Sequence, residues 1–420
     1  MRGPGLTLRA AAGALARGEL RAEELMASVL GRARETEPVH HAYVHLDEEN
    51  AMAAARAADR AARRGPLHGI PIGVKDLIAT AGQPTEAGSP AFAGHRPAAD
   101  AWVVGRLRAA GAIVVGKHHT HEFGFGLDEP PTRNAVDPDR YPGGSTAGGG
   151  VSVALGSSLA AIGTDGGGSI RKPAALNGVA GFKPTHGLVS TAGVLPGVTD
   201  LDHIGWITPT AGDAALLLEV LTGRTATPPR GLRLGCPAGF LDGLDPEVEQ
   251  CFRAAVDVVE IDIPRMAAAA EIHGVIAAAQ SVTVHAATPL DLVHPGVRAF
   301  LESARSSRTE TGLAAALRDR DRLRGAVERA FCDHEVDFLC SPTVALPAVP
   351  MAEMDPERML SAYCRLTLPY NLTGHPALSV PCGTTAAGLP VGLQLAGRLG
   401  QDAAVLRGGE MLENTLAGRD

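Results

Sequence analysis

The sequence predicts an α/β fold in which helices cover a sheet of buried strands. Residues 69–78 contain the apolar run GIPIGV, residues 100–111 are predicted to form a helix, and residues 112–116 read AIVVG. A helix between two short apolar runs is typical of a βαβ unit, so we expect a largely parallel sheet. The composition fits an ordinary globular core, because 45% of the residues are hydrophobic and 20% are charged.

The other elements are predicted from the spacing of apolar residues along the chain. Between residues 6 and 65 apolar side chains recur at helical spacing, and AMAAARAADRAARR contains strong helix formers, which predicts a helical arm. Further helices are expected over residues 148–159 and 210–222, and a short buried strand over residues 160–164. Towards the end, DFLCSPT, LTLPYNLTGHPALSVPCG and GLPVGLQLAGR are apolar runs punctuated by proline, a pattern of short buried strands.

The most informative stretch is rich in glycine and contains two serines, Ser145 and Ser169, 24 residues apart. It reads YPGGSTAGGGVSVALGSSLAAIGTDGGGSIRKPAALNGVAGFKP and spans residues 141–184. Dense glycine lets backbone amides turn towards one point and lets a ligand approach closely. We therefore predict an oxyanion hole, which needs fixed N–H donors beside a nucleophile, from the amides of Gly166, Gly167, Gly168 and Ser169.

A serine nucleophile needs a base, and Lys75 is the candidate. It follows the apolar run GIPIGV, where burial would favour a neutral amine. The chain holds 38 lysines and arginines together, of which only Lys75, Lys117, Lys172 and Lys183 are lysines. A chain that prefers arginine for surface charge suggests that its few lysines need what arginine lacks, an amine that can lose its proton.

These motifs together resemble the amidase signature family. GIPIGVKDLIAT, PGGSTAGGG and GTDGGGSIRKPAALNGVAGFKPTHG match in order and spacing, and the resemblance runs from about residue 15 to residue 416. It implies that Ser169 is the nucleophile, that Ser145 is a bridging serine after a cis peptide bond at Gly144, and that Lys75 is the base. The family usually reads GGSSGGS where this chain has GGSTAGGG.

The resemblance also implies an architecture. We expect one large domain over residues 1–420, with a mixed central β-sheet covered by helices on both faces. Its parts would be a helical N-terminal arm (1–65), a catalytic core (66–222), a shortened variable helical region (223–340), and closing strands with a C-terminal helix (341–420). The resemblance implies a strand over residues 258–263, and this chain reaches it without the longer helix and loop that family members usually carry. This short middle region predicts an open site, and a homodimer is the oligomer that the resemblance implies.

The loop after the second apolar run contains three histidines, His118, His119 and His121. A zinc site is not expected, because Phe125 stands where the second histidine of HExxH would be. The resemblance instead places this loop on the wall of the substrate pocket. The residues it implies for substrate binding are Gly144, Glu122, Phe123 and Phe125.

Several polar residues near the motifs are predicted to be structural. Asp165 and Arg171 flank the second serine and are expected to form an ion pair that holds the loop. Asp76 is interpreted as a cap or an ion-pair partner, and Asn371 and Gln394 as structural.

The remaining composition excludes several classes of function. The net charge of −8 offers no basic surface for nucleic acid, and no uninterrupted apolar run of about 18 residues predicts a membrane span. The six cysteines form no CxxC pair and are interpreted as reduced thiols. No secretory signal is recognised, so we expect a cytoplasmic enzyme with no cofactor, no metal and a small-molecule amide as substrate.

The motifs leave three functions to weigh against each other. The first is an amidohydrolase that cleaves a small amide, with aryl amides, aliphatic amides, carbamates and ureas all open and an apolar or aromatic acyl group favoured. The second is the glutaminase (A-type) subunit of a tRNA-dependent amidotransferase; such subunits commonly carry an aspartate where this chain has Cys364, three residues before Thr367. The third, an inactive binding module, is disfavoured because Lys75, Ser145 and Ser169 are all present. The cysteine and the short middle region favour the hydrolase.

Overall fold

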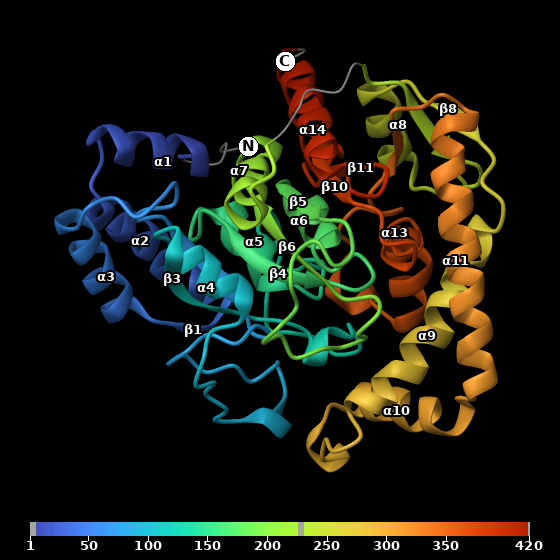
Figure 1. Ribbon diagram of the computed structural model, residues 1–420, viewed down its shortest axis with the longest axis horizontal. Coiled ribbons are helices and arrows are strands. Elements are labelled where there is room, and N and C mark those ends of the chain that lie inside the picture. The colour runs from blue at the N-terminus through green and yellow to red at the C-terminus, as the bar shows by residue number, and fades with distance from the viewer. Residues whose placement is uncertain (1–5, 226–230, 419–420) are drawn as a thin grey trace.

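The computed structural model describes residues 6–225 and 231–418, and these build one eleven-stranded sheet with helices around it (Figure 1). The strand order is β1-β3-β2-β4-β6-β5-β10-β11-β9-β7-β8. The strands are β1 Tyr43–Leu46, β2 Pro71–Lys75, β3 Ile113–His118, β4 Ala161–Asp165, β5 Ala180–Lys183, β6 His203–Thr208, β7 Leu234–Pro237, β8 Val259–Ile261, β9 Phe338–Pro342, β10 Ala377–Thr384 and β11 Pro390–Ala396.

The helices lie at both ends of this sheet and on both of its faces. In Figure 1 the N-terminal helices lie at one end and α9 to α11 at the other. The helices are α1 Leu8–Arg17, α2 Ala22–His40, α3 Glu48–Arg60, α4 Trp102–Ala109, α5 Ala147–Leu155, α6 Arg171–Asn177, α7 Ala211–Thr222, α8 Pro246–Ala255, α9 Ala269–Val284, α10 Pro295–Ser307, α11 Glu310–Asp333, α12 Pro356–Arg358, α13 Leu368–Leu372 and α14 Asp402–Ala417.

The sheet is mixed, so the expectation of a largely parallel sheet is wrong and the mixed sheet implied by the resemblance is confirmed. β3, β2 and β4 are parallel neighbours, as the βαβ pattern predicts, and β9, β7 and β8 are parallel as well. Every pair between β4 and β9 is antiparallel. The two closing strands, β10 and β11, are joined by residues 385–389, a connection too short for a parallel crossover.

The alternation of side chains along β6 shows how the two faces are covered. Ile204 and Trp206 pack with α7 and α14 in the larger core on one face. Ile207 points to the other face, where it packs with residues of α5 and α6. Successive side chains of a strand point to opposite faces, so this central strand contributes to both cores.

The predicted elements are found with shifted boundaries, and four strands, β1, β5, β6 and β7, lie where no strand was predicted. The segment 6–65, predicted to be helical, contains strand β1 between α2 and α3, and this strand forms the edge of the sheet beside β3. At the opposite edge the middle region contains β7, which was not predicted, and β8, which lies within the strand expected over residues 258–263.

One helical stretch, residues 266–284, is long and apolar enough by length and composition to cross a membrane, although Glu271 and His273 interrupt its apolar run. In the structure this stretch packs against α10, α11 and α13. Its polar His273 contacts the glycine-rich loop before Ser169, as described below. We interpret it as a helix of the folded domain.

Candidate active site

Two parallel strands bring the candidate residues together at their carboxyl ends. β2 ends at Lys75 and its neighbour β4 ends at Asp165, so the carboxyl ends of both strands lie side by side. Ser169 follows β4 within a few residues, just before α6 begins at Arg171. Strand pairing therefore gathers two serine motifs that follow Lys75 by 70 and 94 positions in the sequence.

Lys75 is fully buried and bonded to hydroxyl groups. Its Nζ donates to Ser145 Oγ at 2.7 Å and to Thr164 Oγ1 at 2.8 Å. Burial lowers the pKa of Lys75 to about 7, against the opposing charges of Asp202 and Asp165 and with help from the like charge of Lys172. A large fraction of Lys75 is thus neutral at neutral pH, which a general base requires.

Ser145 and Ser169 line the same cavity, which has a volume of about 280 Å³. The peptide bond between Gly144 and Ser145 is cis, as the resemblance implies. The Thr146 N–H donates to the Ser169 carbonyl at 3.0 Å and ties the two serine loops together. No hydrogen bond joins the two serine hydroxyls in this structure, and such bonds often tighten only when substrate is bound.

The glycine loop before Ser169 offers fewer free amides than the sequence predicts. The Gly168 N–H donates to Asp165 Oδ1 at 2.6 Å, so this amide is turned away from an incoming oxyanion. The N–H groups of Gly166, Gly167 and Ser169 donate to no other described residue. These three are the donors that remain for an oxyanion hole.

The carbonyls of the same loop are held by two side chains from distant parts of the chain. His273 Nε2 lies 2.8 Å from the Gly166 oxygen, and Thr367 Oγ1 donates to the Gly167 oxygen at 2.9 Å. Fixing the carbonyls fixes the peptide planes and with them the directions of the neighbouring N–H groups. A preorganised donor set needs such fixation before charge develops on the substrate.

Asp165 and Arg171 form the predicted ion pair, with 3.0 Å between Arg171 Nη2 and Asp165 Oδ1 and both side chains fully buried. Burial alone would raise the pKa of Asp165, but Arg171 holds it well below its usual value. Arg171 also donates to Gln394 Oε1, and Asn371 Nδ2 donates to Asp165. This network anchors the loop that carries Ser169 and joins four residues that were predicted to be structural, whereas the fifth, Asp76, pairs with Lys117 at 3.4 Å.

Arg171→Met tests this anchor. The change leaves the Asp165 carboxylate buried without its counter-charge, and breaking a buried pair in this way typically costs about 3–5 kcal/mol of unfolding free energy. We expect a clear fall in the midpoint of denaturant unfolding. Exposed Arg253, which pairs with Glu249 within α8, provides the control, and Arg253→Met should leave the midpoint nearly unchanged. Equal, small effects of both changes would contradict the anchoring role.

The predicted substrate-binding residues divide into two groups. Phe123 and Phe125 line the cavity, whereas Glu122 and Gly144 do not. The buried Glu122 carboxylate accepts hydrogen bonds from Ser89 Oγ and from the His294 N–H, so it joins its loop to the start of α10. At Gly144 a Cβ would lie 2.1 Å from His121 Cε1, so glycine is needed there to fit the histidine ring.

Two of the three histidines pack against different aromatic side chains. His118 packs on Tyr43, with 4.6 Å between ring centroids, and His121 packs on Tyr141 at 6.5 Å. Within residues 6–225 and 231–418, no group of three or more His, Cys, Asp or Glu side chains could hold a metal ion. The six cysteines are all free.

The cavity has further lining residues that sequence reasoning did not assign to it. Asp202 lies close to Gly166, and burial raises the pKa of its carboxyl group to about 6. Lys172 and Cys364 also line the wall. Both residues had been named from the sequence without being assigned to the cavity, and α9 and α10 add His273, Ala277 and Phe300 to its lining.

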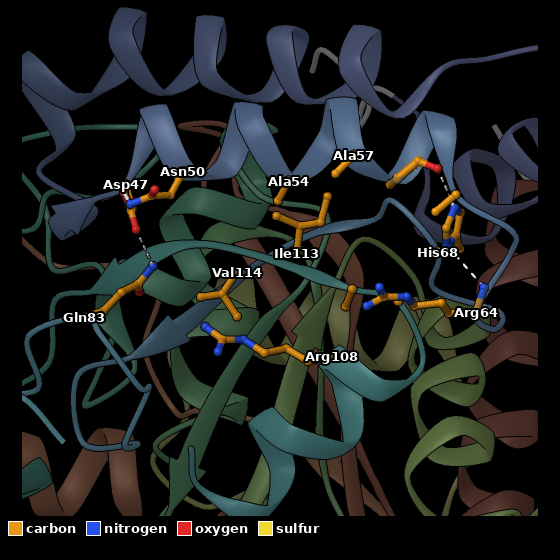
Figure 2. A pocket seen from close by; sticks show the side chains of 14 residues that line it. Asp47, Asn50, Ala54, Ala57, Arg64, His68, Gln83, Arg108, Ile113 and Val114 are labelled. Carbon is orange, nitrogen blue, oxygen red and sulfur yellow. Dashed lines mark hydrogen bonds between the residues drawn. The ribbon is translucent and has the colours of Figure 1, made fainter. Parts of the chain in front are cut away.

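A second hollow, of about 340 Å³, lies between α3 and β3 (Figure 2). It is lined by residues such as Asp47, Asn50, His68 and Arg108. Neither serine and none of the other candidate site residues is part of it. The cavity beside Ser169 is therefore the candidate active site, although it is the smaller of the two.

Comparison with known proteins shows the family of the chain. A family model described as Amidase matches residues 24–406, so the chain belongs to the amidase signature family. It is an enzyme family that acts on carbon–nitrogen bonds, and the mixed single-domain α/β fold is that of its solved members.

The individual relatives carry two kinds of name. The A-type subunit of the glutamyl-tRNA(Gln) amidotransferase of Chloroflexus aggregans is 40% identical over 469 aligned positions, which cover 96% of this chain and 95% of the relative. A crystal structure of an amidase superposes with a TM-score of 0.91 at 36% identity, covering 98% of this chain and all of that one. The corresponding amidotransferase subunit of Thermotoga maritima superposes with a TM-score of 0.78 at 28% identity, covering 92% and 90%.

Proposed function

We propose that this chain hydrolyses the C–N bond of a small amide through an acyl-enzyme on Ser169. The observation that carries the proposal is the contact of 2.7 Å between buried Lys75 and Ser145, beside a cavity that Ser145 and Ser169 both line. A buried amine on a serine hydroxyl is a base with a route for its proton. The free amides next to Ser169 complete the requirements for acyl transfer.

The proposed steps balance protons through the two serines. Neutral Lys75 takes the proton of Ser145 while Ser145 takes the proton of Ser169, whose Oγ attacks the amide carbon. The oxyanion is held by the N–H groups of Gly166, Gly167 and Ser169. Ser145 then returns a proton to the leaving nitrogen, Lys75 replaces it, and the C–N bond breaks. Water attacks the acyl-enzyme by the same route and releases the acid.

The pH dependence follows from the pKa of Lys75. Below about pH 7 the amine is protonated and cannot accept a proton, so we expect kcat/KM to rise with pH through about 7 and then level. Asp202 titrates nearby, so Asp202→Asn is the control. Removing its negative charge lowers the pKa of Lys75, which moves the rising limb to lower pH without abolishing it. A profile that is flat from pH 5 to 8 would contradict Lys75 as the base.

The cavity supports a hydrolase acting on a largely apolar amide. Phe123, Phe125 and Phe300 line it together with leucine and methionine side chains. At the position where amidotransferase subunits commonly carry an aspartate, Cys364 presents a thiol to the cavity. The solved amidase superposes with a higher TM-score than the solved amidotransferase subunit, whereas the names of the sequence relatives favour the second candidate.

The second candidate, a glutaminase subunit, is favoured by a different observation. The relative from Chloroflexus aggregans, 40% identical, is named as the A-type subunit of a glutamyl-tRNA(Gln) amidotransferase. The alignment of 469 positions exceeds the 420 residues of this chain, so that relative carries segments that are missing here. On this candidate function the chain would release ammonia from glutamine and need other subunits as partners.

Turnover by the purified chain separates the two candidates. The substrates are a chromogenic aryl amide, an aryl carbamate and glutamine, each given to the chain alone and to the chain with the other subunits of a bacterial amidotransferase. Turnover of the aryl substrates by the chain alone supports the hydrolase. Ammonia from glutamine only when the other subunits are present would support the amidotransferase and contradict the first proposal.

A further inference from the structure

All four lysines of the chain are buried, and three of them have oxygen partners. Lys75 donates to Ser145 and Thr164, as described above. Lys117 Nζ donates to the carbonyl of Ile78 and to Thr85 Oγ1 and pairs with Asp76, and Lys183 Nζ donates to the carbonyls of Pro184 and His375. These contacts give each ammonium or amine acceptors inside the protein.

Lys172 differs from the other three. It is 5% exposed, and its Nζ lies 3.1 Å from Cys364 Sγ and 3.8 Å from Met359 Sδ. Within the described parts of the chain, no oxygen accepts a hydrogen bond from this amine and no carboxylate pairs with it. Sulfur is a weak acceptor, so the buried amine of Lys172 has no strong hydrogen-bond acceptor among these residues.

The position of Lys172 connects this demand to the active site. Lys172 follows Ser169 by three residues, about one helical turn. Its side chain passes Gly168, because a Cβ added to that glycine would lie 3.2 Å from Lys172 Cγ. Lys172, Cys364 and Met359 all line the cavity that holds the two serines. Among the described residues that line the cavity only Asp202 is acidic, and it forms no ion pair with Lys172.

We propose that Lys172 binds an anionic group, a carboxylate, on the amide substrate, so that the substrate is the amide of an acid-bearing molecule. This inference rests on the proposed function, because it names the class of substrate for the same site. A carboxylate that entered the cavity would supply oxygen acceptors to Lys172, whose partners within the described residues are sulfur atoms. The phenylalanine wall would meanwhile cover the apolar part of the same molecule.

The first test measures binding without turnover. Ser169→Ala is titrated calorimetrically with succinamate, glutaramate and adipamate, and with butyramide, pentanamide and hexanamide, in which a methyl group replaces the carboxylate. We expect at least one acid amide to bind about 10- to 100-fold more tightly than its neutral partner, because a hydrogen bond to a charged group is involved. The double variant with Lys172→Met should lose this preference.

The second test measures turnover at the alkaline plateau, where a change in the pKa of Lys75 does not enter. Lys172→Met should reduce the ratio of kcat/KM between an acid amide and its neutral partner by about 10- to 100-fold. Cys364→Asp, which keeps Lys172 but gives it a carboxylate partner, should reduce the same ratio. Leu368→Met, a change in a neutral cavity residue, is the matched control and should leave the ratio unchanged.

The outcomes separate the inference from the function on which it rests. Equal binding of acid and neutral amides, no binding of either, or a preference that survives Lys172→Met would overturn the role of Lys172. A Lys172-dependent preference without ammonia release from any of the six amides would contradict the proposed hydrolysis of such amides and leave the anion site standing.

Discussion

Ser169→Ala is expected to reduce kcat by at least about 10⁴-fold, because the nucleophile of a covalent mechanism has no substitute in the cavity. Ser145 is the other cavity serine, but its oxygen accepts the Lys75 hydrogen bond at 2.7 Å and is held in the bridging position. The residual rate should come from binding and from the free amides of the glycine loop. Ammonia or aniline release under saturating substrate measures the loss.

A matched control separates chemistry from folding. Ser152 is a buried serine of α5 whose hydroxyl donates to the Gly149 carbonyl, and it does not line the cavity. Ser152→Ala should retain most of the activity, and both variants should unfold near the wild-type temperature. Wild-type activity in Ser169→Ala would mean that another group attacks the substrate.

Lys75→Ala and Lys75→Met are expected to lower kcat/KM by about 10²–10⁴-fold at neutral pH, the usual contribution of a general base. The methionine variant keeps the apolar length of the side chain, so the fold should survive with Ser145 and Thr164 left to bond elsewhere. Activity should recover in part at alkaline pH, because hydroxide can then take the proton that Lys75 accepts in the wild type. Rates measured from pH 6 to 10 test both statements.

The pH profile of Lys172→Met provides a contrast with that of Lys75→Met. Lys172 also lines the cavity, and its charge helps to lower the pKa of Lys75 after the larger effect of burial. Lys172→Met should therefore raise the pKa of Lys75 and shift the rising limb to higher pH, whereas Lys75→Met should remove the limb near pH 7 and leave only the rise at alkaline pH. Retention of the wild-type limb in Lys75→Met would show that another group titrates.

The central arrangement could be predicted from the sequence because its signals are local. A short apolar run before Lys75 predicts a buried strand with the lysine at its end, and the structure has β2 ending at that residue. The glycine-rich segments around Ser145 and Ser169 identified both serines as candidates, the family resemblance implied their roles, and strand pairing between β2 and β4 brings them to Lys75. Asp165 and Arg171 are close in sequence, and their ion pair was foreseen for that reason.

The remaining features depend on contacts between distant segments. The Gly168 amide turns to Asp165, a choice between acceptors that glycine density does not reveal. His273 reaches the Gly166 carbonyl from α9, more than a hundred residues later, with no motif around it. The short strand β1 was missed because it lies between two helices and is stabilised by pairing with β3.

The measurement that tests the proposed mechanism most directly is the location of the acyl group. The chain is treated with an aryl carbamate ester, whose carbamoyl group leaves the enzyme slowly, and the digested protein is mapped by mass spectrometry. We expect release of one phenol per chain and a carbamoyl group on Ser169, absent in Ser169→Ala and slowed in Lys75→Met. Modification of Ser145, or turnover with no modified serine, would contradict the mechanism.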